Sequence, residues 1–155
     1  MEIFTDGGCW GNPGKGGWAF ILESSAGRLA RKGGELVTTN NRMELTAVIR
    51  ALETVQAGMT NSEAGVPALA SGEFVDIHTD SQYVQKGITI WIHGWMRNGW
   101  KTAAKDPVKN QELWQELWEI QKQLPLRWHW VKGHAGHPQN EACDSLVQEA
   151  IGALS

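Results

Sequence analysis

The sequence is poor in cysteine, with only Cys9 and Cys143 in 155 residues. A disulfide framework or a cysteine zinc site needs more thiols at closer spacing, so both are excluded and a reducing cytoplasm is the expected location. The chain also lacks an apolar run of about 18 residues, which excludes a membrane-spanning helix. The residues after Met1 show none of the zones of a secretory signal peptide.

The remaining composition is that of a soluble globular chain, with 41% hydrophobic and 20% charged residues. A chain of 155 residues fits one compact domain of common size. We find no internal repeat and no stretch that reads as a linker. We therefore expect a single domain over residues 1–155.

The net charge of −3 argues against a nucleic-acid binder, but the charges are unevenly distributed. Residues 86–109, called the basic segment below, hold five basic residues and one acid. The rest of the chain holds nine basic residues and sixteen acids. A basic island on an acidic body indicates a local contact with a polyanion. Part of the acidic excess could be a metal site, where bound ions offset it.

The hydrophobic pattern predicts an element order of β-β-β-α-β-α-α-α-β-α. Strands are expected at residues 2–5, 17–22, 28–37, 74–79 and 126–131, and the glycine-rich residues 7–17 contain a turn signal, Asn12-Pro13-Gly14. Helical periodicity is clearest over residues 110–123 and after Pro138. Residues 57–72 read as a long loop. This order is typical of one mixed sheet with helices packed on its faces, an α/β fold.

Four acids lie where such a fold would expose them. Asp6 is expected at the end of the first strand and Asp80 at the end of the fourth. Glu44 and Asp144 are expected in the first turns of the first and last helices. Ligand sites of α/β sheets gather at the carboxyl ends of strands, so the four could meet there. Each acid alone reads better as a turn residue or a solvated helix-start residue.

If the four carboxylates do meet, their repulsion calls for a cation. Oxygen ligands suit Mg²⁺, with Mn²⁺ as the alternative, and two such ions about 3.5–4 Å apart can hydrolyse a phosphodiester. We therefore expect metal-dependent phosphodiester hydrolysis.

Five segments in order along the chain narrow this expectation. They are FTDG (residues 4–7), TTNNRMEL (38–45), TDSQYV (79–84), WVKGHAGH (130–137) and NEACD (140–144). Together they closely resemble the bacterial type 1 ribonuclease H family, and the resemblance covers residue 2 to about residue 150. It implies a ribonuclease H-like fold with a five-stranded mixed sheet. It also implies an endonuclease that cuts the RNA strand of RNA–DNA hybrids and leaves 3′-hydroxyl and 5′-phosphate ends.

The resemblance also implies roles for individual residues. Its carboxylate set, which holds Mg²⁺, is Asp6, Glu44, Asp80 and Asp144, with His134 as an auxiliary catalytic residue on a loop. Its RNA-strand contacts are Cys9, Asn12, Asn40, Asn41 and Gln82. Its DNA-strand contacts are Tyr83, Trp91 and Trp95, with Thr39 and Asn110 matching a phosphate pocket. From their own pattern, Trp100, Arg97 and Lys101 join the DNA side, because aromatic and basic residues alternate there.

Three departures from the family's pattern bear on substrate binding. Residues 94–99 carry fewer basic residues than relatives often do, and Val37 stands where relatives often have an arginine. Both of these departures predict weaker substrate binding rather than a slower cleavage step. The loop at 57–72 is longer than in close relatives, and nothing in the sequence gives it a function.

Other functions fit parts of this pattern. A glycosidase also uses paired carboxylates and tryptophans, but it needs no metal, so EDTA separates it from a nuclease. A hybrid-binding module without catalysis would tolerate loss of an acid, yet all four acids and His134 are present. Integrases and resolvases have a similar set of metal-binding carboxylates. The basic segment and the asparagines at the RNA-contact positions favour ribonuclease H over these enzymes. We expect a monomer that acts on hybrids and not at a membrane.

Overall fold

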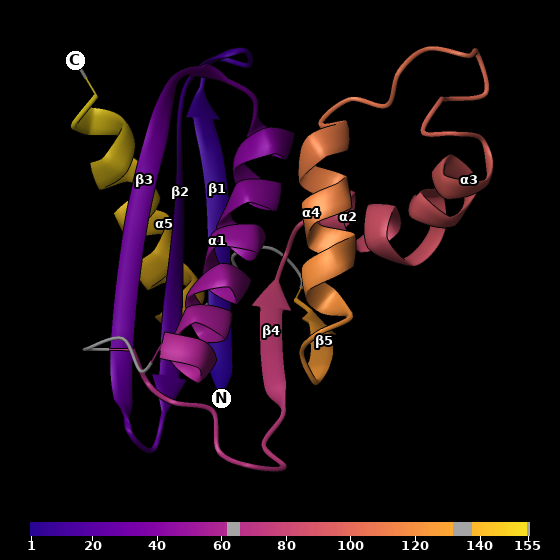
Figure 1. Cartoon of the computed structure of the whole chain (residues 1–155). Helices are drawn as coiled ribbons and strands as arrows, with labels where there is room; N and C mark the ends of the chain where they lie inside the picture. The colour runs from indigo at the N-terminus through magenta and orange to yellow at the C-terminus, as the bar shows by residue number, and fades with distance from the viewer. Residues whose placement is uncertain (62–65, 132–137, 155) are drawn as a thin grey trace.

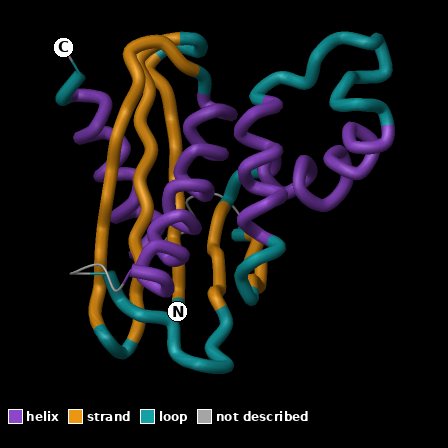
Figure 2. The backbone as a smooth tube through the Cα atoms, viewed as in Figure 1, coloured by secondary structure: helices purple, strands orange, loops and turns teal. Residues whose placement is uncertain are grey.

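The computed structural model describes residues 1–61, 66–131 and 138–154. Five strands form one sheet in the order β3-β2-β1-β4-β5 (Figures 1 and 2). The strands are β1 (Glu2–Trp10), β2 (Gly14–Ser24), β3 (Gly27–Thr38), β4 (Val75–Thr79) and β5 (Leu126–Trp130). The first three pair antiparallel, whereas β4 pairs in parallel with both β1 and β5. The predicted five-stranded mixed sheet is confirmed.

Helices cover both faces of this sheet, in the predicted order. They are α1 (Asn40–Asn61), α2 (Gln82–Lys86), the π-helical turn η1 (Gly87–Trp91), α3 (Ile92–Arg97), α4 (Gln111–Gln121) and α5 (Pro138–Gly152). Helices α1 and α4 pack on one face and on each other, and α5 packs on the opposite face (Figure 1). None of the helices in the described ranges is both long and apolar enough to cross a bilayer.

The main core lies between the sheet and the helices α1 and α4. Ile3, Phe20, Leu52 and Trp114 are each fully buried there. On the other face, two small clusters join α5 to the sheet; their members are Phe4, Ile21, Cys143, Ala19, Val147 and Ile151. The helical stripe predicted for α5 is thus confirmed.

The glycine-rich residues 7–17 are mostly strand, so the first two strands are longer than predicted, while the turn signalled by Asn12-Pro13-Gly14 lies at residues 11–13. β1 runs on to Trp10 and β2 begins at Gly14. Glycine is needed because helices approach the strands closely. A Cβ on Gly7 would lie 2.4 Å from the backbone carbon of Met43, and one on Gly17 would lie 2.9 Å from the carbonyl oxygen of Val147. The glycines therefore provide close helix packing rather than a long turn.

Helix α1 extends to Asn61, into the region predicted to be a loop. The loop predicted over 57–72 is correspondingly shorter at its start. Residues 57–61 include weak helix formers such as Gly58, and the helix continues through them because adding residues to a formed and packed helix costs less than starting one. Residues 62–65 lie outside the described part of the chain.

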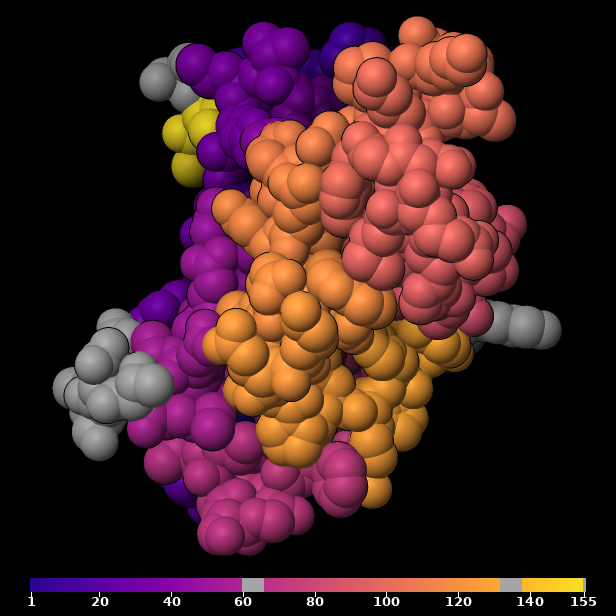
Figure 3. Space-filling model, turned by 45° about the vertical axis from the view of Figure 1, so that its right-hand side comes forward, coloured from indigo at the N-terminus to yellow at the C-terminus, as the bar shows by residue number. Residues whose placement is uncertain are grey.

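The basic segment projects from the body of the protein. Helical structure is continuous from Gln82 to Arg97 through η1, and the chain then loops back to α4 (Figures 1 and 3). Its base is fixed by Gly87, where a Cβ would lie 2.0 Å from the Trp114 ring. The segment is therefore anchored to the core at its base while most of its residues beyond Lys86 remain accessible.

Candidate active site

The sheet brings Asp6 and Asp80 to the same end of the neighbouring strands β1 and β4. β1 and β4 run parallel, with Ile3 opposite Ile77 and Phe4 opposite His78. Asp6 and Asp80 each lie two residues beyond this last pair, and so continue its register. Asp80 directly follows β4, as predicted. The prediction that Asp6 ends its strand was wrong. β1 continues to Trp10, and beyond Phe4 it pairs only with β2.

Glu44 reaches this place from α1. Its backbone nitrogen would lie 2.5 Å from a Cβ on Gly7, so the helix start touches β1 next to Asp6. The Ser81 hydroxyl donates a hydrogen bond of 2.6 Å to Glu44 Oε2. Burial raises the pKa of the Glu44 carboxyl, the Ser81 bond opposes this, and the negative charge of Asp80 raises the pKa further. Glu44 and Asp80 are therefore electrostatic neighbours.

Asp144 approaches from the opposite face of the sheet. It lies on α5 directly after Cys143, which packs against Phe4 of β1. Side chains alternate along a strand, so Asp6 shares the face of Phe4. Burial raises the pKa of the Cys143 thiol to about 12, and the charge of Asp6 contributes to this rise. Asp6 thus lies near the turn of α5 that carries Asp144.

The chemistry of this donor set fits a hard divalent cation. All four predicted ligands present oxygen, and a cation would offset the repulsion that raises the pKa of Glu44. Within the described ranges, however, no three His, Cys, Asp or Glu side chains already stand close enough to hold an ion. The four acids come to one end of the sheet from four segments, namely β1, α1, α5 and the residue after β4, and they would have to move closer together to share an ion. His134, the fifth predicted catalytic residue, lies outside the described residues.

The residues predicted at the RNA strand lie around the starts of α1 and α2. The side-chain amide oxygen of Asn12 accepts a hydrogen bond from the backbone N–H of Asn40, so these two residues are in contact. The Cys9 thiol donates to the backbone carbonyl oxygens of Gly14 and Thr38 at 3.2 and 3.4 Å. Asn41 is exposed beside Asn40, and Gln82 is exposed at the start of α2.

Three residues predicted at the DNA strand lie at the starts of α1, α2 and α4. Thr39 caps α1, because its hydroxyl oxygen accepts from the backbone N–H of Arg42 at 3.2 Å. Asn110 precedes α4 in a left-handed conformation, with φ of 59°. Its amide nitrogen donates to the Tyr83 hydroxyl oxygen at 3.2 Å.

An aromatic row follows from Tyr83 into the basic segment. Tyr83 meets Trp91 edge-on at 6.0 Å between ring centroids, Trp91 lies 6.0 Å from Trp95, and Trp95 lies 6.3 Å from Trp100. Trp91 is 38% exposed, whereas Trp95 and Trp100 are half-buried. Arg97 and Lys101 are exposed beside the row. The predicted alternation of aromatic and basic residues therefore forms one surface.

Sequence reasoning missed two residues of this region. Ser81 was not singled out, although a serine three residues before Val84 is a helix-cap signal and follows Asp80 directly. Arg42 was quoted only within a motif. Its guanidinium contacts Asn110, Glu112 and Glu35, which come from distant parts of the sequence.

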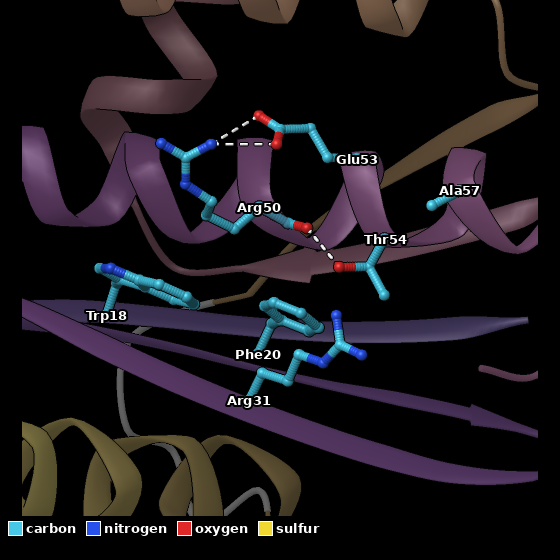
Figure 4. A pocket seen from close by; sticks show the side chains of 7 residues that line it. All are labelled: Trp18, Phe20, Arg31, Arg50, Glu53, Thr54 and Ala57. Atoms are coloured by element: carbon cyan, nitrogen blue, oxygen red, sulfur yellow. Dashed lines mark hydrogen bonds and ion pairs between the residues drawn. The ribbon is translucent and has the colours of Figure 1, made fainter. Parts of the chain in front are cut away.

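A cavity of about 270 Å³ lies apart from the acids, between α1 and strands β2 and β3 (Figure 4). Trp18 and Phe20 form its floor with nearly parallel rings, 6.1 Å apart. On its rim, Arg50 is paired with both oxygens of Glu53 at 2.8 and 3.0 Å. None of the four predicted ligands lines this cavity, so it is not the active site.

Comparison with known proteins places this arrangement in a family. Residues 1–152 match the family model for RNase H. The ribonuclease H of Treponema denticola is 52% identical over 153 residues, which cover 97% of this chain and 96% of the relative. That of a Bradyrhizobium species is 54% identical over 151 residues, covering 97% of this chain and 89% of the relative.

Solved structures agree. LC9-RNase H1, described as a type 1 RNase H with the type 2 active-site motif, is 32% identical with a TM-score of 0.77, covering 99% of this chain and 72% of that one. LC11-RNase H1, solved in complex with an RNA/DNA hybrid, is 25% identical with a TM-score of 0.67, covering 97% and 96%. The match over nearly the whole sequence and fold shows that this chain belongs to the ribonuclease H family, hydrolases that cut the RNA strand of RNA–DNA hybrids.

Proposed function

We propose that this chain cuts the RNA strand of hybrids at internal positions with Asp6, Glu44, Asp80 and Asp144 as its metal ligands, leaving 3′-hydroxyl and 5′-phosphate ends. The observation that carries the assignment is the register of β1 and β4, because Asp6 and Asp80 each follow the last pair, Phe4 and His78, by two residues. It is supported by the contact of Glu44 with Ser81 and by the packing of α5 against β1.

The metal in this proposal is Mg²⁺, with Mn²⁺ as the alternative, and two ions are held once substrate phosphate completes their ligands. Such a pair supplies a water of lowered pKa and offsets the charge on the departing oxygen. The chain's own part is to hold the oxygen ligands in place. The Ser81 hydroxyl restrains the Glu44 carboxylate, and β1 and β4 fix the backbone of the two aspartates.

We assign His134 to proton transfer or product release. Its usual pKa near 6.5 suits either task at neutral pH. It stands between glycines in the sequence Gly133-His134-Ala135-Gly136. We expect His134→Ala to slow turnover but to retain measurable activity, and an inactive variant contradicts an auxiliary role.

Selectivity for RNA rests on its 2′-hydroxyl, which both donates and accepts hydrogen bonds. We assign this contact to a group of uncharged residues, and its members are Cys9, Asn12, Asn40, Asn41 and Gln82. The bond between Asn12 and Asn40 supports the grouping, because it brings two distant segments together next to Glu44's helix start. Uncharged polar groups suit readout of a hydroxyl without preference for a base sequence.

We assign the DNA strand to a second group of residues, which includes the aromatic row and part of the basic segment. Its residues are Thr39, Tyr83, Trp91, Trp95, Arg97, Trp100, Lys101 and Asn110. Aromatic faces stack on bases or sugars, and basic side chains contact phosphates. The continuity of the row from Tyr83 to Trp100 supports this assignment.

One chain suffices for this function, because each proposed ligand and contact comes from a single copy; a monomer is therefore our proposal for the working state. A reducing cytoplasm is the proposed location. It is supported by Cys9 and Cys143, which are both free thiols.

The test is cleavage of an end-labelled RNA–DNA hybrid with Mg²⁺ and with EDTA, beside RNA–RNA, DNA–DNA and single-stranded RNA. We expect internal RNA cuts only in the hybrid and only with metal. Asp80→Asn should abolish cutting by at least about a thousandfold, while Glu53→Gln on the exposed side of α1 serves as the charge-matched control. A hybrid that is bound but never cut would instead mean a binding module.

A further inference from the structure

The pairing of β1 with β4 stops one row short of the two aspartates. The last paired residues of these strands are Phe4 and His78, and Asp6 and Asp80 each lie two residues further on. Beyond Phe4, β1 pairs only with β2. The separation of the two carboxylates therefore also depends on the side chains that join β1 and β4 at this last pair.

That last pair is part of a stack of three rings from three neighbouring strands. Phe4 of β1 is opposite His78 of β4, which is opposite His129 of β5. The Phe4 and His78 rings lie 4.7 Å apart with 17° between their planes, and the His78 and His129 rings lie 4.7 Å apart with 14° between theirs. Phe4 is buried, whereas the His78 side chain is 19% exposed and that of His129 is 46% exposed. These three side chains, called the ring stack below, cross β1, β4 and β5 one row before the aspartates.

Hydrogen bonds fix both imidazoles of the ring stack to the preceding row of the sheet. That row consists of Glu2, Asp76 and Arg127, which are opposite one another on β1, β4 and β5. His78 Nε2 is hydrogen-bonded to Glu2 Oε2, which joins β4 to β1. His129 Nε2 is hydrogen-bonded to Asp76 Oδ1 at 2.8 Å, which joins β5 to β4. Each imidazole therefore ties its strand to the neighbouring strand and is held in one orientation.

The buried end of the ring stack also reaches helix α5. Phe4 packs against Cys143, whose thiol donates a hydrogen bond to the Phe4 carbonyl oxygen at 3.4 Å. Asp144 follows Cys143 directly in the sequence. On this face of the sheet, α5 packs against β1, β2 and β3, and the ring stack continues the packing from β1 toward β4 and β5. The ring stack thus connects the three segments that carry Asp6, Asp80 and Asp144.

Groups that support metal ligands from behind fix their orientation, and loss of such a group lowers metal affinity by about 10- to 100-fold. We propose that the ring stack sets the separation of Asp6, Asp80 and Asp144 as metal ligands. His78 is its central positioning residue. The inference rests on the proposed function, because it takes these acids as the ligands. His78 acts only through the residues it holds, since it keeps β1 and β4 one ring spacing apart at the row before the aspartates.

Binding of Mn²⁺ to the hybrid-free protein, measured by isothermal titration calorimetry, separates positioning from stability. His78→Ala removes the middle ring, and we expect the Kd for Mn²⁺ to rise about tenfold. His78→Phe keeps a ring in the middle of the stack and should bind Mn²⁺ within about twofold of wild type. His129→Ala removes only the outer, more exposed ring, which is a milder change to the fold, and should raise the Kd about threefold.

Trp128→Leu is the matched control. Trp128 and Trp130 stack at 5.0 Å between ring centroids, and side chains alternate along a strand, so this pair lies on the face of β5 opposite His129. The variant also loses a ring stack and should unfold at a lower urea concentration, but its Mn²⁺ affinity should not change. In cleavage assays, His78→Ala should lower kcat and leave KM for the hybrid unchanged, because no group that contacts the substrate has been removed.

The positioning role is overturned if His78→Ala loses stability but binds Mn²⁺ as the wild type does. It is also overturned if His78→Phe is as weak as His78→Ala, which would assign the effect to the bond with Glu2, or if Trp128→Leu loses as much Mn²⁺ affinity. Asp80→Asn tells this failure from that of the proposed function. If Asp80→Asn binds Mn²⁺ as the wild type does, the acids are not the ligands and both proposals fail. If Asp80→Asn loses Mn²⁺ affinity while His78→Ala keeps it, only the inference about the ring stack fails.

Discussion

Ser81 connects helix α2 to the carboxylate of Glu44. Its hydroxyl oxygen accepts from the Val84 N–H at 3.1 Å, and its proton is donated to Glu44 Oε2 at 2.6 Å. Ser81→Ala removes both bonds. We expect the free energy of unfolding to fall by about 1 kcal/mol from loss of the cap and kcat to fall roughly tenfold as Glu44 loses its restraint. Urea unfolding and steady-state cleavage check the two effects, with the exposed Ser145→Ala as control. A stability loss with unchanged kcat would leave Ser81 as a helix cap only.

Gly7 is the point where α1 meets β1, and it has no room for a side chain. A Cβ there would lie 2.4 and 2.5 Å from backbone atoms of Met43 and Glu44. Gly7→Ala should lower the free energy of unfolding by about 3 kcal/mol and displace Glu44, reducing cleavage as well. Gly94→Ala is the matched variant, because nothing lies within 4 Å of a Cβ there and alanine favours a helix. It should raise stability by about 0.5–1 kcal/mol. A Gly7→Ala protein as stable as wild type would refute the close contact.

Asp76 lies at the other end of β4 and gives a prediction for acid stability. The Arg127 guanidinium, bonded at 2.8 and 3.1 Å, and then His129 hold the pKa of Asp76 at about 2, below its usual 3.8. Because the pKa of Asp76 is lower in the folded state, its ionised carboxylate stabilises the fold at pH values above the unfolded-state pKa. This contribution is present above about pH 3.8 and is lost as the pH falls toward 2. Because Arg127 and His129 are about half exposed, we expect about 1–2 kcal/mol rather than the full shift.

Asp76→Asn should therefore be less stable than wild type at pH 7, and the gap should narrow below pH 3.8. Urea unfolding at pH 7, 4 and 2.5 measures this directly. Glu119→Gln, which removes an exposed pair with Lys122, should change stability by less than about 0.5 kcal/mol. A gap that stays constant down to pH 2.5 would mean that the ion pair contributes nothing and that the loss comes from packing.

The order of elements could be predicted because it rests on local signals. Pro138 at the start of α5, the periodic stripe of α4 and the apolar run of β4 are all visible within a few residues. Asp6 was misplaced at a strand end for the same reason: its neighbours are glycines, which read locally as a turn. Only the approach of Met43 and Val147 explains why glycines continue the strands, and that approach is tertiary.

Contacts between distant segments could not be predicted from the sequence, because they also depend on tertiary packing. Glu35, Asn110 and Glu112 meet Arg42 only because β3, α1 and α4 pack together. No spacing in one sequence records such a meeting. For Ser81, the sequence could indicate the cap of α2 but not the hydrogen bond to Glu44. The helical end of α1 at Asn61 also depends on packing more than on its weakly patterned residues.

Trp91 offers a test that separates substrate binding from chemistry. It is the most exposed of the three tryptophans that follow Tyr83, and it contacts Tyr83 and Trp95 rather than any of the acids. Stacking on a base or sugar contributes about 1–3 kcal/mol per contact, so Trp91→Ala should raise KM for a hybrid about tenfold while kcat stays near the wild-type value. Phe74→Ala, an exposed aromatic at the opposite end of the sheet, should leave KM unchanged. Steady-state cleavage over a range of hybrid concentrations decides the matter. An unchanged KM with a collapsed kcat would show that Trp91 supports the geometry of the acids, and the DNA strand would then have to lie elsewhere.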